Sequence, residues 1–265
     1  MHPWTMGESL RTSLPAQEIQ PPSETGGGDW DALWEHGGFP EPLLRRDSRF
    51  SRRWRSLRLE QLSRGDLREV AQITELGAME TLMQLLAESS AQQSVYYNWH
   101  VRFRSPLILS SVGSTCSFAC TMASYRPWFK NIAKSLRKEP KWFLRDWSGL
   151  ADDGMRAETF VACHLLKAVE GWTDLGLGDF ELRYLRDEQK REVDFLVVRD
   201  RKPWFLVKAK LSETALSSSL AHFQAQAKAS HAFQAVINLP YEPVDCFRAH
   251  QPVAVPARIF LSQLL

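Results

Sequence analysis

The chain has 265 residues, of which 44% are hydrophobic and 24% charged, and its formal net charge is +2. This composition is typical of a globular protein and argues against a disordered one, and the length allows one large domain or two small ones. No apolar run is long enough to cross a bilayer, so we expect no membrane partner. The mildly basic balance permits nucleic-acid binding without arguing for it, because both signs of charge are mixed along the chain.

Cysteine usage and the N-terminal residues favour a reducing compartment. Cys116 and Cys120 form a close pair, but no second pair or nearby His completes a zinc site. Cys163 falls on the apolar side of a predicted helix, where we expect a core thiol. The first residues lack the basic start and apolar stretch of a signal peptide, so the sequence predicts a cytoplasmic protein.

The first half of the chain is predicted to be mainly helical. Residues 1–28 are rich in Pro, Ser, Gln and Gly, which is typical of a flexible arm. Apolar residues at helical spacing predict helices over 29–36, 48–63 and 66–89. The arginines around the second helix are interpreted as a solvated face, with a nucleic-acid-binding stripe as the alternative. They are Arg45, Arg46, Arg49, Arg52, Arg53, Arg55 and Arg58.

Residues 90–127 keep neither a helical nor a strand period, and they are predicted to be irregular or to have lost an original pattern. An α/β pattern follows. Its predicted elements are a strand at Trp142–Leu144, a helix at Asp152–Glu170, strands at Phe180–Leu185, Glu192–Val198 and Trp204–Lys210, a helix at Leu216–Ser230 and a buried strand at Phe233–Leu239. The order from the first helix onward is the α-β-β-β-α-β core of restriction-endonuclease-like folds.

Charged residues interrupt two of these apolar strands. Asp194 lies within Val193–Val198, and Lys208 and Lys210 follow Phe205–Val207. Because burying an unpaired charge is costly, such residues usually face a partner, a ligand or a metal. An Asp on one strand and a Lys on the next is the arrangement of a PD-(D/E)XK nuclease core, in which carboxylates hold a divalent cation and the Lys positions the attacking water.

The candidate catalytic residues are therefore Asp194 and Lys210, together with Glu158, which lies in the first turn of the predicted preceding helix, where nuclease cores often place an accessory carboxylate. The candidate Mg²⁺ ligands are Asp194 and Glu158. Lys208 stands where the motif requires an acid, and its positive charge should weaken cation binding.

Two acids could take the place of the missing one. Glu192 lies two residues before Asp194 and so on the same strand face, and Glu213 follows the third strand. In the structural alternative, Lys208 and Lys210 form ion pairs with Asp194 and Glu158 and have no chemical role.

Several segments together carry a family resemblance. They are Gly37–Pro42, Phe129–Lys141, Phe143–Trp147, Gly154–Glu158, Arg191–Phe195, Leu206–Thr214 and Phe223–Gln224. Through them the chain resembles, over roughly residues 30–240, the C-terminal half of prokaryotic predicted AAA+ ATPases that carry the domain of unknown function 4143. The resemblance implies a P-loop ATPase, a winged-helix-like segment and a nuclease-like C-terminal domain. It also places Gln224 near the site, where its amide would contact a phosphate, with a solvent-facing glutamine as the alternative. Lys208 is the other expected nucleic-acid contact.

The chain departs from this plan, because it has no Gly-x-x-x-x-Gly-Lys-[Ser/Thr] motif and thus no expected ATP site or ATPase activity. The expected organisation is a flexible arm (1–28), a helical remnant of an ATPase lid (29–89), an irregular, degraded winged-helix segment (90–127), a nuclease-like domain (128–240) and a C-terminal tail (241–265).

The expected function is that of a truncated or degenerate member of this family. It would associate with DNA and be at most a weak metal-dependent nuclease. The alternative is a regulatory or protein-interaction fragment that acts with a separately encoded ATPase.

Overall fold

The structure is a computed structural model that describes residues 2–24, 26–61, 90–91, 122–125 and 141–265. The predicted helix over 66–89 and nearly all of the predicted irregular segment 90–127 lie outside these residues, as does the turn predicted before Trp142. The described part is a mixed α/β structure, which confirms the predicted fold class at this level.

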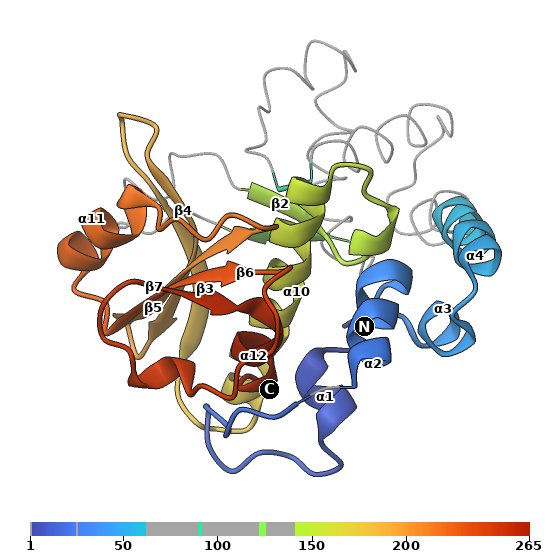
Figure 1. The fold of residues 1–265 in the computed structure, drawn as a ribbon, viewed down its shortest axis with the longest axis horizontal. Helices are drawn as coiled ribbons and strands as arrows, with labels where there is room; N and C mark the ends of the chain where they lie inside the picture. Colours follow the sequence, from blue (N-terminus) through green and yellow to red (C-terminus); the bar gives the residue numbers. More distant parts are fainter. Residues whose placement is uncertain (1, 25, 62–89, 92–121, 126–140) are drawn as a thin grey trace, which may run out of the picture.

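A five-stranded mixed sheet forms the centre of the fold (Figure 1). Its strands, in spatial order, are β3 (Phe180–Arg186), β4 (Glu192–Arg199), β5 (Lys202–Lys210), β6 (His231–Val236) and β7 (Val253–Pro256). The first three strands form an antiparallel meander, whereas β6 runs parallel to β5 and β7 parallel to β6. The predicted order of helix, three strands, helix and strand is observed from α10 (Asp153–Asp174) to β6.

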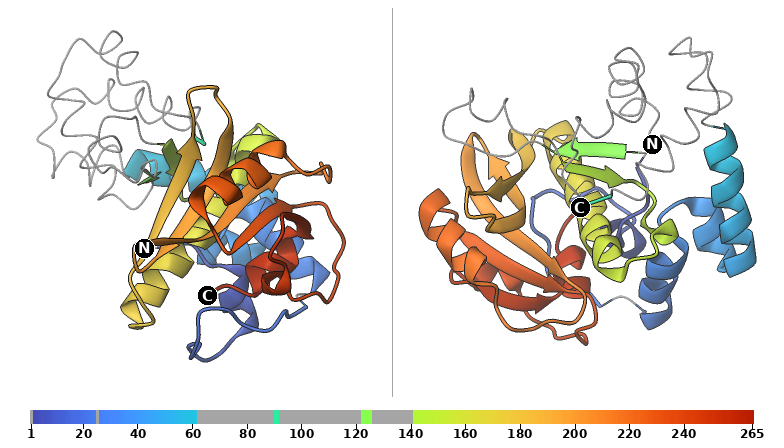
Figure 2. Two further views of the ribbon diagram at one scale, coloured as in Figure 1. Left: turned by 90° about the vertical axis from the view of Figure 1, so that its left-hand side faces the viewer. Right: turned by 90° about the horizontal axis from the view of Figure 1, so that it is seen from above.

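Helices cover both faces of the sheet (Figure 2). Helix α10 and the short helix α12 (Ala257–Ser262) pack on one face, where Phe160, Phe195 and Phe233 belong to the larger core. Helix α11 (Ser218–Ala227) packs on the other face, where Leu196, Leu206 and Phe223 belong to the second core. Burial on both faces explains the near-continuous apolar runs of β4 and β5.

The β4–β5 hairpin turns through two residues, because Arg199 pairs directly with Lys202. Asp200 and Arg201 both have positive φ, of 48° and 64°, as a type I′ turn requires. A register shift between Val197 and Val198 separates this turn from the part of the two strands that carries Asp194 and Lys208.

Of the N-terminal helices that the structure describes, the one over Gly27–His36 packs against α10 through aromatic residues. These helices are α1 (Met6–Leu10), α2 (Gly27–His36), α3 (Pro40–Arg45) and α4 (Ser48–Gln61). The rings of Trp30 and Trp34 lie 5.3 and 5.5 Å from that of Phe160. Trp147, in the 3₁₀ helix η2 (Trp147–Gly149), packs on Phe160 and donates its Nε1–H to the carbonyl of Leu33 at 2.9 Å.

The two ends of the described chain lie together. Thr5 caps α1, Met6 is fully buried, and the Gln20 amide donates to the Gln263 carbonyl at 2.8 Å. Within the segment that the sequence predicts as a flexible arm, Met6 is therefore packed and Gln20 is bonded to the C-terminal residues, whereas Leu14 is 77% exposed. The predicted tail contains the 3₁₀ helix η3 (Cys246–Arg248), strand β7 and helix α12. Strand β7 is part of the five-stranded sheet, and the apolar residues of α12 are part of the larger core.

A separate two-stranded sheet lies next to α10. It pairs β1 (Met122–Tyr125) with β2 (Lys141–Leu144) in antiparallel orientation, with Lys141 opposite Tyr125. Hydrogen bonds also tie β2 to α10. Cys163 Sγ on α10 donates to the Leu144 carbonyl, and Ser90 Oγ bridges the Leu144 amide and Thr159 Oγ1 on α10. These contacts position Lys141 against α10.

Candidate functional site

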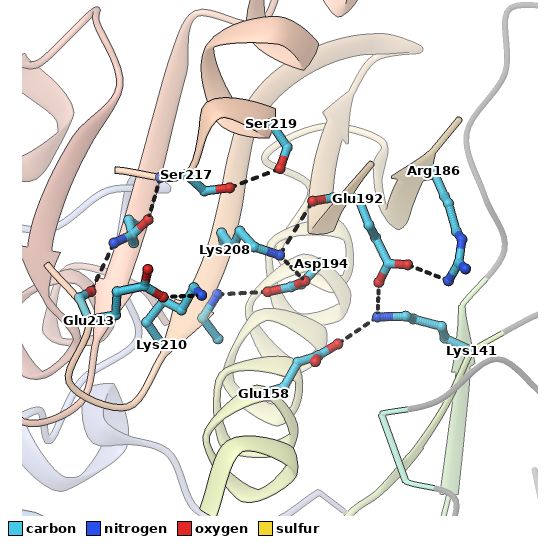
Figure 3. A network of polar contacts seen from close by, with 12 residues as sticks. Lys141, Glu158, Arg186, Glu192, Asp194, Lys208, Lys210, Glu213, Ser217 and Ser219 are labelled. Atoms are coloured by element: carbon cyan, nitrogen blue, oxygen red, sulfur yellow. Dashed lines mark hydrogen bonds and ion pairs between the residues drawn. The ribbon is translucent and has the colours of Figure 1, made fainter. Parts of the chain in front are cut away.

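Three carboxylates from α10 and β4 meet between these two elements (Figure 3). Glu158 lies in the second turn of α10, while Glu192 and Asp194 lie on β4. One carboxylate oxygen from each residue lies within 4.8 Å of the other two. Asp194 is 4% exposed, and Glu158 and Glu192 are partly buried. We call these three residues the carboxylate cluster.

A β-bulge in β4 explains how Asp194 reaches this cluster. Arg183 pairs with Leu196 and Leu185 with Val193, so that two steps along β3 match three along β4. The extra residue shifts the alternation of side chains, because Val193 belongs to the core under α11 but Phe195 to the core under α10. The bulge thereby brings the Asp194 carboxylate to the Glu158 side of the sheet.

Lys141 bridges two members of the carboxylate cluster, Glu158 and Glu192 (Figure 3). Its Nζ donates to Glu158 Oε1 at 2.7 Å and also forms an ion pair with Glu192 Oε1. The Lys141 side chain is only 4% exposed. Its Nζ lies 6.0 Å from the centroid of the Phe143 ring and 5.9 Å from that of the Tyr184 ring. A lysine buried to this degree needs carboxylate partners, and here it has two.

Lys208 supplies the counter-charge for Asp194. Its Nζ lies 3.0 Å from Asp194 Oδ1 and donates to the Glu192 carbonyl at 3.3 Å. The backbone amide of Ala209 donates to Asp194 Oδ2 at 2.9 Å. Both oxygens of the Asp194 carboxylate are therefore engaged, which agrees with the predicted ion pair between Lys208 and Asp194.

The remaining charges lie at the edge of this network. Arg186 Nη1 pairs with Glu192 Oε2 at 2.8 Å, and Lys210 pairs with Glu213. The structural alternative expected Lys208 and Lys210 to pair with Asp194 and Glu158. In the structure Lys208 pairs with Asp194, but Lys210 pairs with Glu213, and Glu158 pairs with Lys141. With Lys141, Lys208 and Arg186 opposite Glu158, Glu192 and Asp194, the formal charges balance.

The pKa values reflect this crowding. Burial lowers the pKa of the Lys141 ammonium, but Glu158, Asp194 and Glu192 outweigh it and the pKa is raised overall. Burial raises the pKa of the Glu158 carboxyl to about 7; Asp194 acts in the same direction, and Lys141 opposes both. The ammonium therefore keeps its proton, whereas Glu158 titrates near neutral pH.

The contacts argue against a bound Mg²⁺ at the expected ligands. A divalent cation needs free carboxylate oxygens, and two or more negative charges usually supply them. Here Lys141 is bonded to Glu158, and Lys208 to Asp194, so that a metal ion would meet two ammonium groups at close range. The donor set is that of an ion-pair network, and the residues present do not fit the metal.

Other candidates from the sequence lie apart from the cluster. Gln224 donates to the carbonyls of Ala229 and His250, which fixes the C-terminal end of α11. His164, predicted to be a packed histidine, is buried against Phe160, and burial lowers its pKa to about 4. Neither side chain contacts a member of the carboxylate cluster.

Sequence reasoning did not identify Lys141 and Arg186 as site residues. Lys141 directly precedes Trp142 and Phe143, so it is a charge at the start of an apolar strand, which is the same signal that identified Asp194. The predicted strand began one residue later, at Trp142, and thus excluded it. Arg186 ends an alternating strand, and nothing in its local sequence distinguishes it from an exposed arginine.

Two family models match separate parts of the chain. Residues 153–258 match a domain of unknown function (DUF4143), and residues 27–105 match a second domain of unknown function (DUF8612). The first match contains Glu158, Glu192 and Asp194, and it confirms the expected resemblance to that domain within these bounds. No curated protein and no solved structure matches the chain. Within the described ranges, no helix combines the length and apolar character of a membrane span.

Proposed function

We propose that residues 141–265 form a nuclease-like module that does not cleave nucleic acid, and that the chain associates with nucleic acid through the basic helix α4. The observation that carries the proposal is the carboxylate cluster, in which the acids of a nuclease-type site are paired with Lys141 and Lys208. A cation bound by these acids would have to displace Lys141 or Lys208. The relation to the AAA+ ATPase family that the resemblance implies is part of the same proposal, and no ATPase activity is expected without a Walker motif.

The order and pairing of the elements support a restriction-endonuclease-like core. A helix that carries Glu158 precedes an antiparallel meander, and the middle strand of that meander carries Asp194. The next strand carries Lys208 and Lys210, and a helix then leads to the parallel strand β6. A nuclease core combines a carboxylate on one strand with a lysine on its neighbour.

The basic helix α4 supports the association with nucleic acid. Arg49, Arg52 and Arg53 are exposed, and none of them has a carboxylate partner within the described part of the chain. Other arginines of this region are engaged, since Arg58 lies over the Phe39 ring and Arg55 donates to Ser148 Oγ. Exposed arginines spaced along one helix suit contacts to successive phosphates.

The test is fluorescence anisotropy with labelled single- and double-stranded DNA at several salt concentrations. We expect weak binding that decreases with salt. The slope of log affinity against log salt should become shallower by about 0.9 for each phosphate that an arginine no longer neutralises. The variant Arg49→Gln/Arg52→Gln/Arg53→Gln should therefore bind more weakly and with a smaller slope. The matched control, Lys190→Gln/Arg201→Gln/Lys202→Gln, removes the same charge from exposed residues near the sheet hairpins and should bind like the wild type.

Cleavage is measured on the same DNA with Mg²⁺ and with Mn²⁺. The proposal expects no product in either case. Cleavage that disappears in Asp194→Ala would overturn the non-catalytic part of the proposal. Absence of any salt-dependent binding would overturn the nucleic-acid part and would favour the regulatory fragment that acts with a separate ATPase.

A further inference from the structure

The carboxylate cluster poses an electrostatic problem that any folded form of this chain must solve. Three carboxylate oxygens within 4.8 Å of one another cannot all stay ionised unless positive charge lies close to them. Many proteins solve this with a bound metal ion. In this chain, Lys141 Nζ contacts two of the three acids, Glu158 and Glu192.

We infer that the Lys141 ammonium is the resident cation of the carboxylate cluster, and that it closes the cluster to divalent metal ions. The term resident cation means here a positive side chain that takes the place of a bound metal. The inference shares the pairing of Lys141 with the non-cleaving part of the proposed function, and it holds whether or not the chain binds nucleic acid. DNA binding and Mn²⁺ binding are measured separately, so a failure of the nucleic-acid part leaves the inference intact.

The position of Lys141 distinguishes it from Lys208. Lys141 is 4% exposed and bonds two acids from different elements, α10 and β4. Lys208 is 17% exposed, and of the three carboxylates in the cluster its Nζ pairs only with that of Asp194. The desolvated amine that bridges two carboxylates resembles a metal ion in its contacts, whereas Lys208 resembles a partly solvated ion-pair partner.

Strand β2 holds Lys141 through contacts that do not involve its amine. Leu144 is bonded from both Ser90 and Cys163, and Trp142 and Phe143 are 4% and 1% exposed. Replacing Lys141 with methionine keeps most of the side-chain volume and removes only the charge. We therefore expect Lys141→Met to keep β2 in place, to free the Glu158 carboxylate and to leave Glu192 paired only with Arg186 among the described residues.

The test is isothermal titration calorimetry of the full chain with Mn²⁺, a cation that binds carboxylates. The wild type should give no binding isotherm, and Lys141→Met should bind about one Mn²⁺ per chain, because the carboxylates of Glu158 and Glu192 then face each other without an ammonium group between them. Adding Glu158→Gln to that variant should remove the gained binding. Lys208→Met should stay silent, because Lys141 remains.

The matched control is Lys167→Met, which removes another lysine paired with a glutamate, Glu8, outside the cluster. It should behave like the wild type. Wild-type binding of Mn²⁺ that Glu158→Gln abolishes would overturn the inference. So would a folded Lys141→Met, by circular dichroism, that binds no Mn²⁺.

A second measurement needs no variant and therefore does not depend on how Lys141→Met folds. Brief acetylation of the native wild-type chain, read by mass spectrometry, should modify the exposed Lys202 and spare Lys141. Equal modification of the two lysines would show that the Lys141 amine is free, which would contradict its role as resident cation.

Discussion

Replacing Asp194 with alanine tests the central ion pair of the site by its effect on stability. The carboxylate is 4% exposed and accepts from Lys208 at 3.0 Å and from the Ala209 amide at 2.9 Å. Removing one partner of a buried pair costs ~3–5 kcal/mol, because the other charge stays buried and unpaired. Lys208 is 17% exposed and keeps the Glu192 carbonyl, so we expect a loss near the lower end, about 3 kcal/mol.

The assay is urea unfolding followed by circular dichroism, with the slope of the transition compared between variants. Asp194→Asn keeps an acceptor for the Ala209 amide and should lose less stability than Asp194→Ala. The control is Glu213→Ala, which breaks the exposed pair with Lys210 and should leave the unfolding midpoint unchanged. If Asp194→Ala lies within about 0.5 kcal/mol of the wild type, the buried-pair reasoning is wrong.

Three further predictions concern the pH response and the packing, each measured by the same unfolding assay. Burial raises the Glu158 pKa from 4.5 to about 7, so the folded chain binds this proton more tightly, and stability should fall as pH rises through this window. Glu158→Gln should flatten that fall, and an unchanged pH profile would contradict the assignment. Phe160→Ala should cost ~3–5 kcal/mol, because its fully buried ring packs on three tryptophans. Met6→Ala should cost ~2–5 kcal/mol; a negligible loss would mean that the N-terminal segment does not pack as observed.

The sheet could be predicted where local patterns are strong. Strands β4 and β5 are apolar runs joined by a short polar turn, and helix α10 has a long amphipathic period, so their positions follow from the sequence. The edge strand β7 was not predicted. It is four residues long and lies in a proline-rich segment, and its partner β6 is distant in sequence, so no local period marks it.

The candidate site was predicted only in part, for a related reason. Asp194 and Lys208 could be found because each is a charge within an otherwise apolar strand, and Glu158 because it lies near the start of the helix that precedes the strands. Their partners depend on tertiary structure. A bulge in β4 turns Asp194 toward α10, and β2 brings Lys141 to Glu158. Neither event leaves a periodic signal in the sequence.

The most direct test of the resident cation is an experimental structure of the wild-type chain crystallised with Mn²⁺. The account predicts that Lys141 Nζ lies between Glu158 and Glu192, with no anomalous density at the carboxylate cluster. A manganese ion bound by Glu158 and Asp194, with the Lys141 side chain turned away, would contradict it.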